Sequence, residues 1–403
     1  MSLLDCIGDE AVWNAYYEYK TERAHFSKED ALFFDAFIKE KRYLEISGKF
    51  ARGDYAFSVP EKKLINKLGT EKKRVVYSFS KEESAVLKLL AFLLYKYDGE
   101  MCDNLYSFRR NLGAKAAIRR FTSHERIDKM HGYKLDISNY FNSIDAPRLL
   151  VDLKALFSDD LPLYAFFEGL LLSDKATFCG EIIEEKRGVM AGTPVSPFLA
   201  NVYLMKLDRY FSENDILYAR YSDDIIVFAD TKEEAARHEA YIKGFLSDRA
   251  LSVNEKKERW FEPGERWEFL GVEYRAGSTD IARATLDKVK GKIRRKARAL
   301  YRWKIRKSAA DERALAAFAR TFNKKFFGDG SEDEFTWARW FFPLITTDRT
   351  LREIDGYMQE NMRYIVTGRH NKANFRTSYE KLKDCGYKSL VNEYYKQKKA
   401  SVL

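Results

Sequence analysis

The chain has 403 residues, of which 45% are hydrophobic and 33% are charged, and its formal net charge is +10. This balance is typical of a soluble globular protein and excludes a largely disordered, collagen-like or low-complexity chain. Only 7 residues are proline, which favours long helices. The length predicts two or three substructures around a sizeable core.

Membrane insertion and export are not expected. The best candidate for a membrane span, Ala85 to Tyr95, contains Lys88 and is much shorter than the roughly 20 residues that a span needs. The N-terminal sequence has no basic segment followed by an apolar run, so we expect no signal peptide. The four cysteines lie far apart and form no zinc-binding spacing: Cys6, Cys102, Cys179 and Cys385. We therefore expect a cytoplasmic protein without a membrane partner.

The N-terminal part of the chain reads as helices followed by a short strand. Residues 1–60 are predicted to form a helical extension, in which Ser27 caps a helix with an apolar face. A basic stretch over residues 62–74 leads into a strand at residues 75–77. A long helix is expected over residues 80–95.

The central part of the chain alternates between strands and helices, which indicates an α+β fold with an antiparallel sheet and helices on one face. The predicted strands lie at residues 133–137, at 217–229 as a pair with a tight turn, and at 267–274. The predicted helices lie at residues 149–172, 198–211 and 235–246, with a loop over 187–197. Ser196 and Pro197 are expected to be the N-cap and the first residue of the second of these helices. After about residue 282 the chain is predicted to be almost wholly helical.

Most of the positive charge lies in one segment. Residues 282–308 contain twelve basic residues and one acid, a charge of +11, so the rest of the chain sums to −1. Six apolar residues recur there at helical spacing: Leu286, Val289, Ile293, Ala297, Leu300 and Ile305. The pattern predicts an amphipathic helix with one cationic face. That face is simply solvated, follows a nucleic-acid backbone or binds a membrane surface. The charge density favours the nucleic acid, and a membrane surface is disfavoured because Trp303 is the one evident aromatic residue at its edge.

Three acidic residues are candidates for metal chemistry. Asp223 and Asp224 lie at the tip of the predicted hairpin, and Asp136 ends a separate predicted strand. Neighbouring acids repel, so they must be solvated, paired or bound to cations. If the strands are neighbours, the acids converge and can hold two Mg²⁺ ions about 4 Å apart for phosphoryl transfer. For Asp223 and Asp224 alone, a polar turn is the alternative.

Five segments, in order over roughly residues 62–276, resemble the motifs of reverse transcriptases. Residues 134–144 resemble motif A, 188–197 with 199–204 motif B, 221–224 motif C, 251–257 motif D and 269–271 the primer grip. The resemblance implies an enzyme, an RNA-directed DNA polymerase with a right-hand fold. The fingers and an antiparallel palm would occupy residues 61–280, and an all-helical thumb and C-terminal region would occupy residues 281–403.

The resemblance also implies roles for individual residues. The catalytic acids would be Asp136, Asp223 and Asp224, and with the carbonyl of Ile137 they would bind two Mg²⁺ ions, or Mn²⁺. The nucleotide-binding residues would be Lys73, Arg74, Phe141, Ala191, Gly192 and Lys257. The nucleic-acid-binding residues would be Arg109, Phe269, Leu270, Gly271, Lys292, Arg295, Arg298 and Arg302.

Four of these positions carry a more specific expectation. Phe141 would exclude a ribose 2′-hydroxyl, its alternative being a core aromatic. Gly192 would lie close to the incoming base pair, where a side chain would collide. Lys257 would donate a proton to pyrophosphate, its alternatives being a solvated lysine or a shift of this role to Lys256. Ala191 departs from the family, which usually has Gln there to contact the nucleotide sugar and the template, so the contacts that this Gln makes in ordinary templating are not expected here.

No endonuclease, integrase, protease or ribonuclease H pattern accompanies these motifs. The chain therefore resembles the stand-alone bacterial reverse transcriptases of the unknown and abortive-infection groups, which are related to the group II intron and retron enzymes. Many of these act in antiphage defence, and some copy a dedicated non-coding RNA into DNA from dNTPs. The alternatives are a template-independent DNA polymerase of the abortive-infection type, a retron- or intron-type enzyme, and a non-catalytic RNA-binding scaffold. Further candidate partners are a second copy of the chain, in a homo-oligomer, and an accessory protein.

Overall fold

The computed structural model of the chain describes residues 2–23, 26–53, 55–66, 73–328, 336–371, 374 and 376–400. The chain forms two compact units. The first consists of Met1–Ala117 and Lys129–Pro263, and the second of Ile118–Asp128 and Gly264–Leu403. Two short helices, α5 (Ala114–Thr122) and η3 (Ile127–Lys129), lie where the chain passes between the units. Among the described residues, no helix is both long enough and apolar enough to cross a membrane.

The N-terminal region is helical, as predicted. It contains η1 (Asp5–Gly8), α1 (Glu10–Arg23), α2 (Lys28–Lys39) and α3 (Tyr43–Ala51). The Ser27 side chain accepts a hydrogen bond from the N–H of Asp30, so Ser27 caps α2 as predicted. The rings of Trp13, Phe37 and Tyr43 are buried and pack against one another. An aromatic cluster therefore joins these helices.

A four-stranded sheet follows, in the order β2-β1-β4-β5. Its strands are β1 (Glu61–Asn66), β2 (Lys73–Ser78), β4 (Lys175–Phe178) and β5 (Glu181–Glu184). The sequence predicted β2 but missed β1 and the β4–β5 hairpin. Strands β1 and β5 are mostly exposed and half of their residues are charged, so they lack the alternation of apolar and polar residues that marks a half-buried strand. Strand β4 has only four residues. The predicted long helix is α4 (Lys81–Leu93), which opens with a capping box formed by Ser80 and Glu83 and continues as η2 (Leu94–Glu100).

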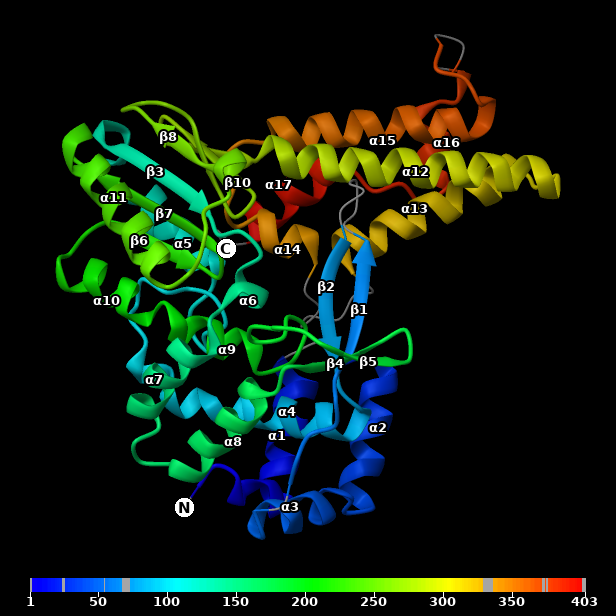
Figure 1. The fold of residues 1–403 in the computed structure, drawn as a ribbon. Helices are drawn as coiled ribbons and strands as arrows, with labels where there is room; N and C mark the ends of the chain where they lie inside the picture. Colours follow the sequence, from blue (N-terminus) through cyan, green and yellow to red (C-terminus); the bar gives the residue numbers. More distant parts are fainter. Residues whose placement is uncertain are drawn as a thin grey trace. The chain divides into compact units, whose positions relative to one another are not determined.

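The central sheet has the strand order β6-β7-β3-β8 and is antiparallel throughout, which confirms the predicted α+β class (Figure 1). Its strands are β3 (His131–Asp136), β6 (Tyr218–Tyr221), β7 (Asp224–Ala229) and β8 (Arg259–Phe261). Helix α11 (Lys232–Asp248) contacts β3 and β7. Tyr133, Leu135 and Ile225 are fully buried in the core of this unit. Their burial explains why these strands were visible in the sequence.

Two predicted helices are each interrupted. Residues 149–172 form α7 (Ala146–Leu156) and α8 (Leu161–Leu172), because the Asp160 side chain caps a new helix by accepting a hydrogen bond from the N–H of Leu163. Residues 198–211 belong to α9 (Ser196–Tyr203) and α10 (Met205–Glu213). The prediction that Ser196 is the N-cap of α9 is wrong. Its hydroxyl contacts the carbonyls of Val189 and Met190 instead and ties down the preceding loop.

The second unit contains a three-stranded sheet and then helices alone among its described residues. The predicted strand over residues 267–274 is a hairpin, because Leu270 and Gly271 both have positive φ and form a two-residue turn. The elements are β9 (Trp267–Phe269), β10 (Val272–Arg275), β11 (Ser278–Ile281), α12 (Arg283–Lys307), α13 (Asp311–Phe327), α14 (Trp337–Phe341), α15 (Arg349–Thr367), α16 (Tyr379–Asp384) and α17 (Leu390–Ala400).

Helix α12 has the predicted amphipathic character with one correction. Five of the six predicted apolar positions are buried, from Leu286 to Leu300. Ile305, however, is 61% exposed, and Lys304 takes the buried position instead. A stripe that follows 3.6 residues per turn from Leu300 reaches residue 304 rather than residue 305. The Lys304 ammonium pairs with Asp311 and donates to the carbonyl of Val366, which explains how a lysine can be buried there.

Candidate active site

Three acidic residues meet at one edge of the central sheet. Asp136 ends β3, Asp224 begins β7, and the two are direct register partners across the antiparallel pair. Asp223 lies in the turn between β6 and β7, and its carbonyl accepts a hydrogen bond from the N–H of Ile137 at 2.9 Å. The two strands are neighbours, so the condition set in the sequence analysis is met and the acids of two distant segments come together.

The acids repel one another and are largely removed from water. Burial raises the pKa of Asp223, and the negative charge of Asp136 raises this pKa further. The charges of Lys257 and Arg74 lower the same pKa. This edge of the sheet therefore carries negative charge that nearby cations stabilise, and Arg74 lies close enough to take part.

Asp224 is in a different environment from the other two acids. Burial raises its pKa to about 6, against the opposing charge of Lys134. The Lys134 Nζ lies 3.3 Å from Asp224 Oδ1. Asp224 is thus engaged by a lysine of the neighbouring strand, which suits an indirect role rather than that of a principal metal ligand.

The Lys257 ammonium lies 2.6 Å from the Asp136 carboxylate, between Nζ and Oδ2. Lys257 ends the short helix η4 (Glu255–Lys257). The preceding residue, Asn254, donates its backbone N–H to the carbonyl of Asp136 at 2.8 Å. This backbone contact fixes the segment beside β3, and the adjacent Lys256 is not the lysine that reaches the acid.

The residues present fit a hard divalent cation. Asp136 and Asp223 offer carboxylate oxygens, and Ile137 offers a backbone carbonyl beside them. In the described part of the chain, no group of three or more His, Cys, Asp or Glu side chains forms a complete metal site. A small number of protein ligands is sufficient for Mg²⁺, because this ion usually keeps several waters and completes its coordination with substrate phosphates.

A buried ion pair supports the acidic turn from behind. Arg220 and Asp208 are both fully buried, and two guanidinium nitrogens reach the two carboxylate oxygens at 2.8 and 2.5 Å. Arg220 also donates to the carbonyl of Ser222, which has φ of +60° in the turn. The N–H of Ser222 donates to the hydroxyl of Ser107 at 2.9 Å. No pattern in the sequence predicts this support, although Arg220 lies only three residues before Asp223.

Two glycines bring the loop over residues 187–195 close to other backbone segments. Gly188 has φ of +55°, and a Cβ there would lie 2.3 Å from the carbonyl oxygen of Phe141. Gly192 has φ of +103°, and a Cβ there would lie 3.1 Å from Val76 Cβ and 3.2 Å from the carbonyl oxygen of Tyr77. The nearest obstacle to a side chain at Gly192 is thus β2 of the protein itself, in addition to any base pair that binds there.

Asn142 joins this loop to β2. Its amide donates to the carbonyl of Val75 at 3.3 Å and accepts from the N–H of Ala191 at 3.1 Å. The carbonyl of Ala191 accepts from the N–H of Tyr77 at 2.8 Å. Because β2 carries the exposed Lys73 and Arg74, these contacts connect the predicted nucleotide-binding cations to the loop.

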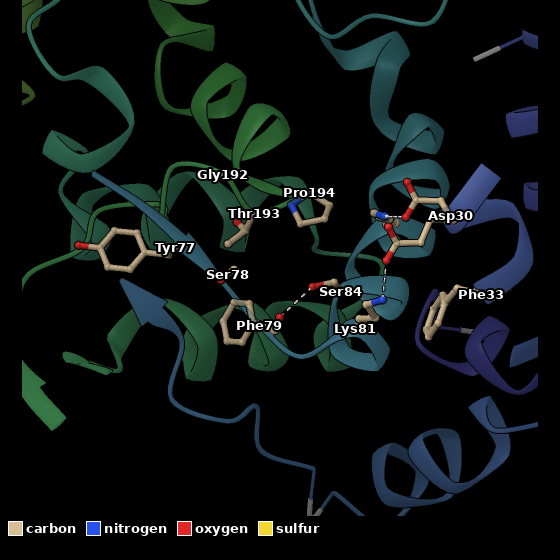
Figure 2. A pocket seen from close by; sticks show the side chains of 12 residues that line it. Asp30, Phe33, Tyr77, Ser78, Phe79, Lys81, Ser84, Gly192, Thr193 and Pro194 are labelled. Carbon is tan, nitrogen blue, oxygen red and sulfur yellow. Dashed lines mark hydrogen bonds and ion pairs between the residues drawn. The ribbon is translucent and has the colours of Figure 1, made fainter. Parts of the chain in front are cut away.

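A cavity of about 260 Å³ lies beside the same loop (Figure 2). Its lining includes Gly192 to Pro194 of the loop, Tyr77 and Ser78 of β2, Phe79 directly after β2, and Phe33 of α2. Ion pairs at its edge join α2 to α4, with 2.9 Å between Lys81 and Glu29 and 3.3 Å between Lys88 and Asp30. Helix α2 therefore forms one wall of a cavity that is also lined by Gly192, a predicted nucleotide-binding residue.

Comparison with known proteins decides the family. The family model described as reverse transcriptase (RNA-dependent DNA polymerase) matches residues 61–274, more than half of the chain. The chain belongs to the reverse transcriptase family. All three acids, the loop over residues 187–195 and Lys257 lie inside the matched region of this reverse transcriptase. A search of curated proteins finds no match.

Similar solved structures include fungal telomerases. Apo telomerase from Candida tropicalis is 14% identical, with a TM-score of 0.45 and coverage of 89% of this chain and 72% of that chain. Telomerase from Candida albicans, in complex with a fragment of telomeric RNA, is 13% identical, with a TM-score of 0.43 and coverage of 89% and 70%. A C-terminally truncated Candida tropicalis telomerase is 14% identical, with a TM-score of 0.44 and coverage of 56% of this chain. The chain spans 55% of the length of that truncated protein.

Several predicted nucleic-acid-binding residues of this reverse transcriptase lie outside the acidic site. The Arg109 side chain is 6% exposed, and it binds the Asp98 carboxylate at 2.6 Å and the carbonyl of Cys102 at 2.8 Å. Phe269 is fully buried in the second unit, while Leu270 and Gly271 form the β9–β10 turn. In this conformation Arg109 and Phe269 serve the fold, and the Leu270–Gly271 turn is the accessible part of the predicted primer grip.

The four predicted basic residues of α12 are all exposed: Lys292, Arg295, Arg298 and Arg302. Their spacing of three and four residues places them on one face of the helix. Lys325 of α13 joins this group and was missed by the sequence analysis. Burial lowers the pKa of Lys325 to about 8, and the charges of Lys292 and Arg295 contribute to the shift. This cationic group lies beyond the matched region, in the second unit.

Proposed function

We propose that the chain is an RNA-directed DNA polymerase that joins deoxynucleotides by two-metal nucleotidyl transfer. The observation that carries the proposal is the register pairing of Asp136 with Asp224, which sets Asp223 beside Asp136 within a reverse transcriptase region. The raised pKa of Asp223 supports it, because such a carboxylate gains from binding cations. Mg²⁺ ions held by Asp136, Asp223 and the carbonyl of Ile137 would activate the 3′-hydroxyl and stabilise the leaving pyrophosphate.

Lys257 and Arg74 supply the positive charge that the reaction needs around the triphosphate. In the structure Lys257 neutralises Asp136 at 2.6 Å. Its side chain is 56% exposed, so it can turn from the acid to an incoming phosphate and donate a proton to pyrophosphate. Lys73 and Arg74 lie exposed on β2, where they can bind phosphate oxygens.

Phe141 selects the sugar in this proposal. It follows β3 in the short helix α6 (Tyr140–Ser143), and its carbonyl accepts a hydrogen bond from the N–H of Val189 at 2.9 Å. The ring is half-buried rather than enclosed in the core. Because Phe141 lies five residues after Asp136 and its backbone is bound to the loop, its ring can exclude a 2′-hydroxyl, so deoxynucleotides are favoured.

Untemplated DNA synthesis is the second candidate, and Ala191 favours it. The backbone of Ala191 is held by Asn142 and Tyr77, but its methyl group cannot hydrogen-bond to a nucleotide sugar or a template strand as the family's Gln does. Templating would then depend on other contacts. The intact acid site argues against a non-catalytic RNA-binding scaffold.

We place the enzyme, on the resemblance, among the stand-alone bacterial reverse transcriptases that act in antiphage defence and copy an associated non-coding RNA. Retron- and intron-type enzymes are the related alternatives. Its partners would be an RNA template, dNTPs and the DNA product in the cytoplasm. The exposed basic face of α12 supports binding to a nucleic-acid backbone. A homo-oligomer or an accessory protein would be additional partners.

Sequencing of the nucleic acids that copurify from cells tests this assignment. The compared proteins are the wild type, Asp223→Asn and the control Asp215→Asn, which changes an exposed acid at a turn with φ of +51° that Asn tolerates. A discrete RNA with all three proteins, and complementary DNA with all but Asp223→Asn, supports copying of a dedicated RNA. DNA without a matching RNA would instead support untemplated synthesis. DNA that persists in Asp223→Asn would contradict the metal assignment.

A further inference from the structure

Phe108 has an unusual backbone conformation for an aromatic residue. Its φ is +54°, in the left-handed region, and 44% of its surface is exposed. Glycine, asparagine and aspartate adopt this conformation most readily, because other side chains crowd the backbone there. An exposed phenylalanine at such a position gains neither an easy backbone conformation nor full burial.

Both neighbours of Phe108 are firmly held, so the surrounding structure imposes its conformation. Ser107 is fully buried, and its hydroxyl contacts Asn201 Oδ1 at 3.2 Å and the N–H of Ser222 at 2.9 Å. The amide of Asn201 donates to the carbonyl of Ser107 at 2.9 Å. On the other side, Arg109 is anchored by Asp98. These contacts tie the segment directly to the turn that carries Asp223.

The Phe108 ring packs edge-to-face against the ring of Phe141. The ring centroids are 6.4 Å apart and the planes meet at 83°, a favourable geometry for two aromatic rings. Phe108 also lines a cavity of about 150 Å³ together with Pro194 and Phe198. The strained residue therefore links three parts of the site: the turn with Asp223, the ring of Phe141, and the loop that contains Gly192.

We propose that Phe108 is a positioning residue for nucleotide selection, which holds the Phe141 ring in place and so sets the discrimination between deoxy- and ribonucleotides. This inference rests on the proposed polymerase function. Removing the Phe108 ring opens space beside Phe141, and that ring can then turn away from the sugar. Backbone strain is commonly retained where a site needs a fixed side chain rather than maximal stability.

The test is the ratio of kcat/KM for a dNTP to kcat/KM for the matching rNTP. The proteins are wild type, Phe108→Ala, Phe108→Leu, Phe108→Gly, Phe141→Ala and the double variant Phe108→Ala with Phe141→Ala. We expect Phe108→Ala to lower the ratio roughly two- to tenfold, the range of an aromatic pair contact, mainly through a lower KM for the rNTP. Phe108→Leu should restore part of the ratio. In the Phe141→Ala background, Phe108→Ala should change nothing further.

Phe108→Gly and Trp260→Ala separate this role from a purely structural one. Phe108→Gly relieves the backbone strain, so it should unfold at the same temperature as wild type or higher while still losing selectivity. Trp260 is a similarly exposed aromatic residue, 37% exposed, in the same unit, and Trp260→Ala should leave the ratio unchanged. An unchanged ratio in both Phe108→Ala and Phe108→Gly would overturn this inference but not the proposed function. Effects of Phe108→Ala that add to those of Phe141→Ala would do the same. Wild type without any product would overturn the proposed function and this inference with it.

Discussion

Arg220 and Asp208 form a bidentate ion pair that is fully buried behind the acidic turn. Tyr218 adds a hydrogen bond to Asp208 at 3.0 Å, and the side chain of Asn104 donates to the Asp208 carbonyl at 2.8 Å. The pair thus connects α10, β6 and the segment that contains Ser107. Its position makes the stability of the fold and the geometry of the acid site depend on the same contacts.

Breaking this pair is expected to destabilise the first unit strongly. Asp208→Asn leaves the buried Arg220 charge without a negatively charged partner, which costs roughly 3–5 kcal/mol of unfolding free energy. Urea denaturation followed by circular dichroism measures the change, and Asp215→Asn at an exposed turn is the matched control. Replacing both members with apolar residues, Arg220→Met with Asp208→Leu, should recover much of the loss. An Asp208→Asn protein as stable as wild type would contradict the expected role of this ion pair.

Variants of Lys257 and Lys256 test whether Lys257 is a specific proton donor or only a solvated lysine. Lys257→Gln is expected to lower the rate of nucleotide incorporation by roughly 10²-fold or more, as for loss of a general acid. Lys256→Gln removes the same charge one residue away and should have little effect. Single-turnover incorporation measures both rates. Equal losses in the two variants would mean that general surface charge, and not a specific residue, supports the reaction.

Alanine variants of Gly192 and Gly180 distinguish the effect of a steric collision from the effect of backbone strain. Both have positive φ, but a Cβ at Gly180 would meet nothing within 4 Å, whereas a Cβ at Gly192 would meet Val76 and Tyr77. Gly192→Ala must therefore shift the loop against β2, and we expect at least a tenfold loss in kcat/KM for dNTPs, roughly 1.4 kcal/mol of transition-state stabilisation. Gly180→Ala should cost stability without a comparable loss of activity. Steady-state kinetics with melting curves tests this, and equal kinetic losses would refute it.

Nucleic-acid binding by the second unit is expected to depend on pH through Lys325. Its pKa is lowered to about 8 by burial and by the charges of Lys292 and Arg295, so it loses its proton as pH rises through this value. Binding of an anionic backbone should therefore weaken between about pH 7 and pH 9. Because the unfolded lysine keeps its proton to a higher pH, stability should rise over the same range. Fluorescence anisotropy with Lys325→Gln as the comparison tests the effect, and an unchanged pH profile in that variant would contradict it.

The parts of the fold that the sequence predicted are those with strong local patterns. Tyr133 and Leu135 alternate with less buried residues along β3, so that strand was visible. The polar strands β1 and β5 carry no such alternation. The pairing that joins the β1–β2 and β4–β5 hairpins, at Glu61 and Thr177, links residues far apart in the sequence, so no local pattern shows it. The helix breaks at Asp160 and at Leu204 were missed because the apolar runs on both sides look continuous.

The acid site could be predicted because its residues occur in a recognisable order along the chain. The contacts that support the acid site could not be predicted. The convergence of Asp136 and Asp223 follows from two strands whose motifs can be read along the chain. The contacts of Asn142 with Val75 and of Ser107 with Ser222 join segments 67 and 115 residues apart, and no local pattern announces such pairs. The left-handed conformation of Phe108 is likewise imposed by its neighbours and is opposite to what its side chain prefers.

Primer extension by purified protein tests the central claim most directly. Wild type, Asp223→Asn and Asp215→Asn are each given an RNA template, an annealed DNA primer, dNTPs and Mg²⁺, and the products are resolved by length. The account predicts template-complementary extension by wild type and Asp215→Asn, and none by Asp223→Asn, which should still bind the primer–template. Extension by Asp223→Asn at the wild-type rate, or none by wild type on any RNA or DNA template, would contradict it.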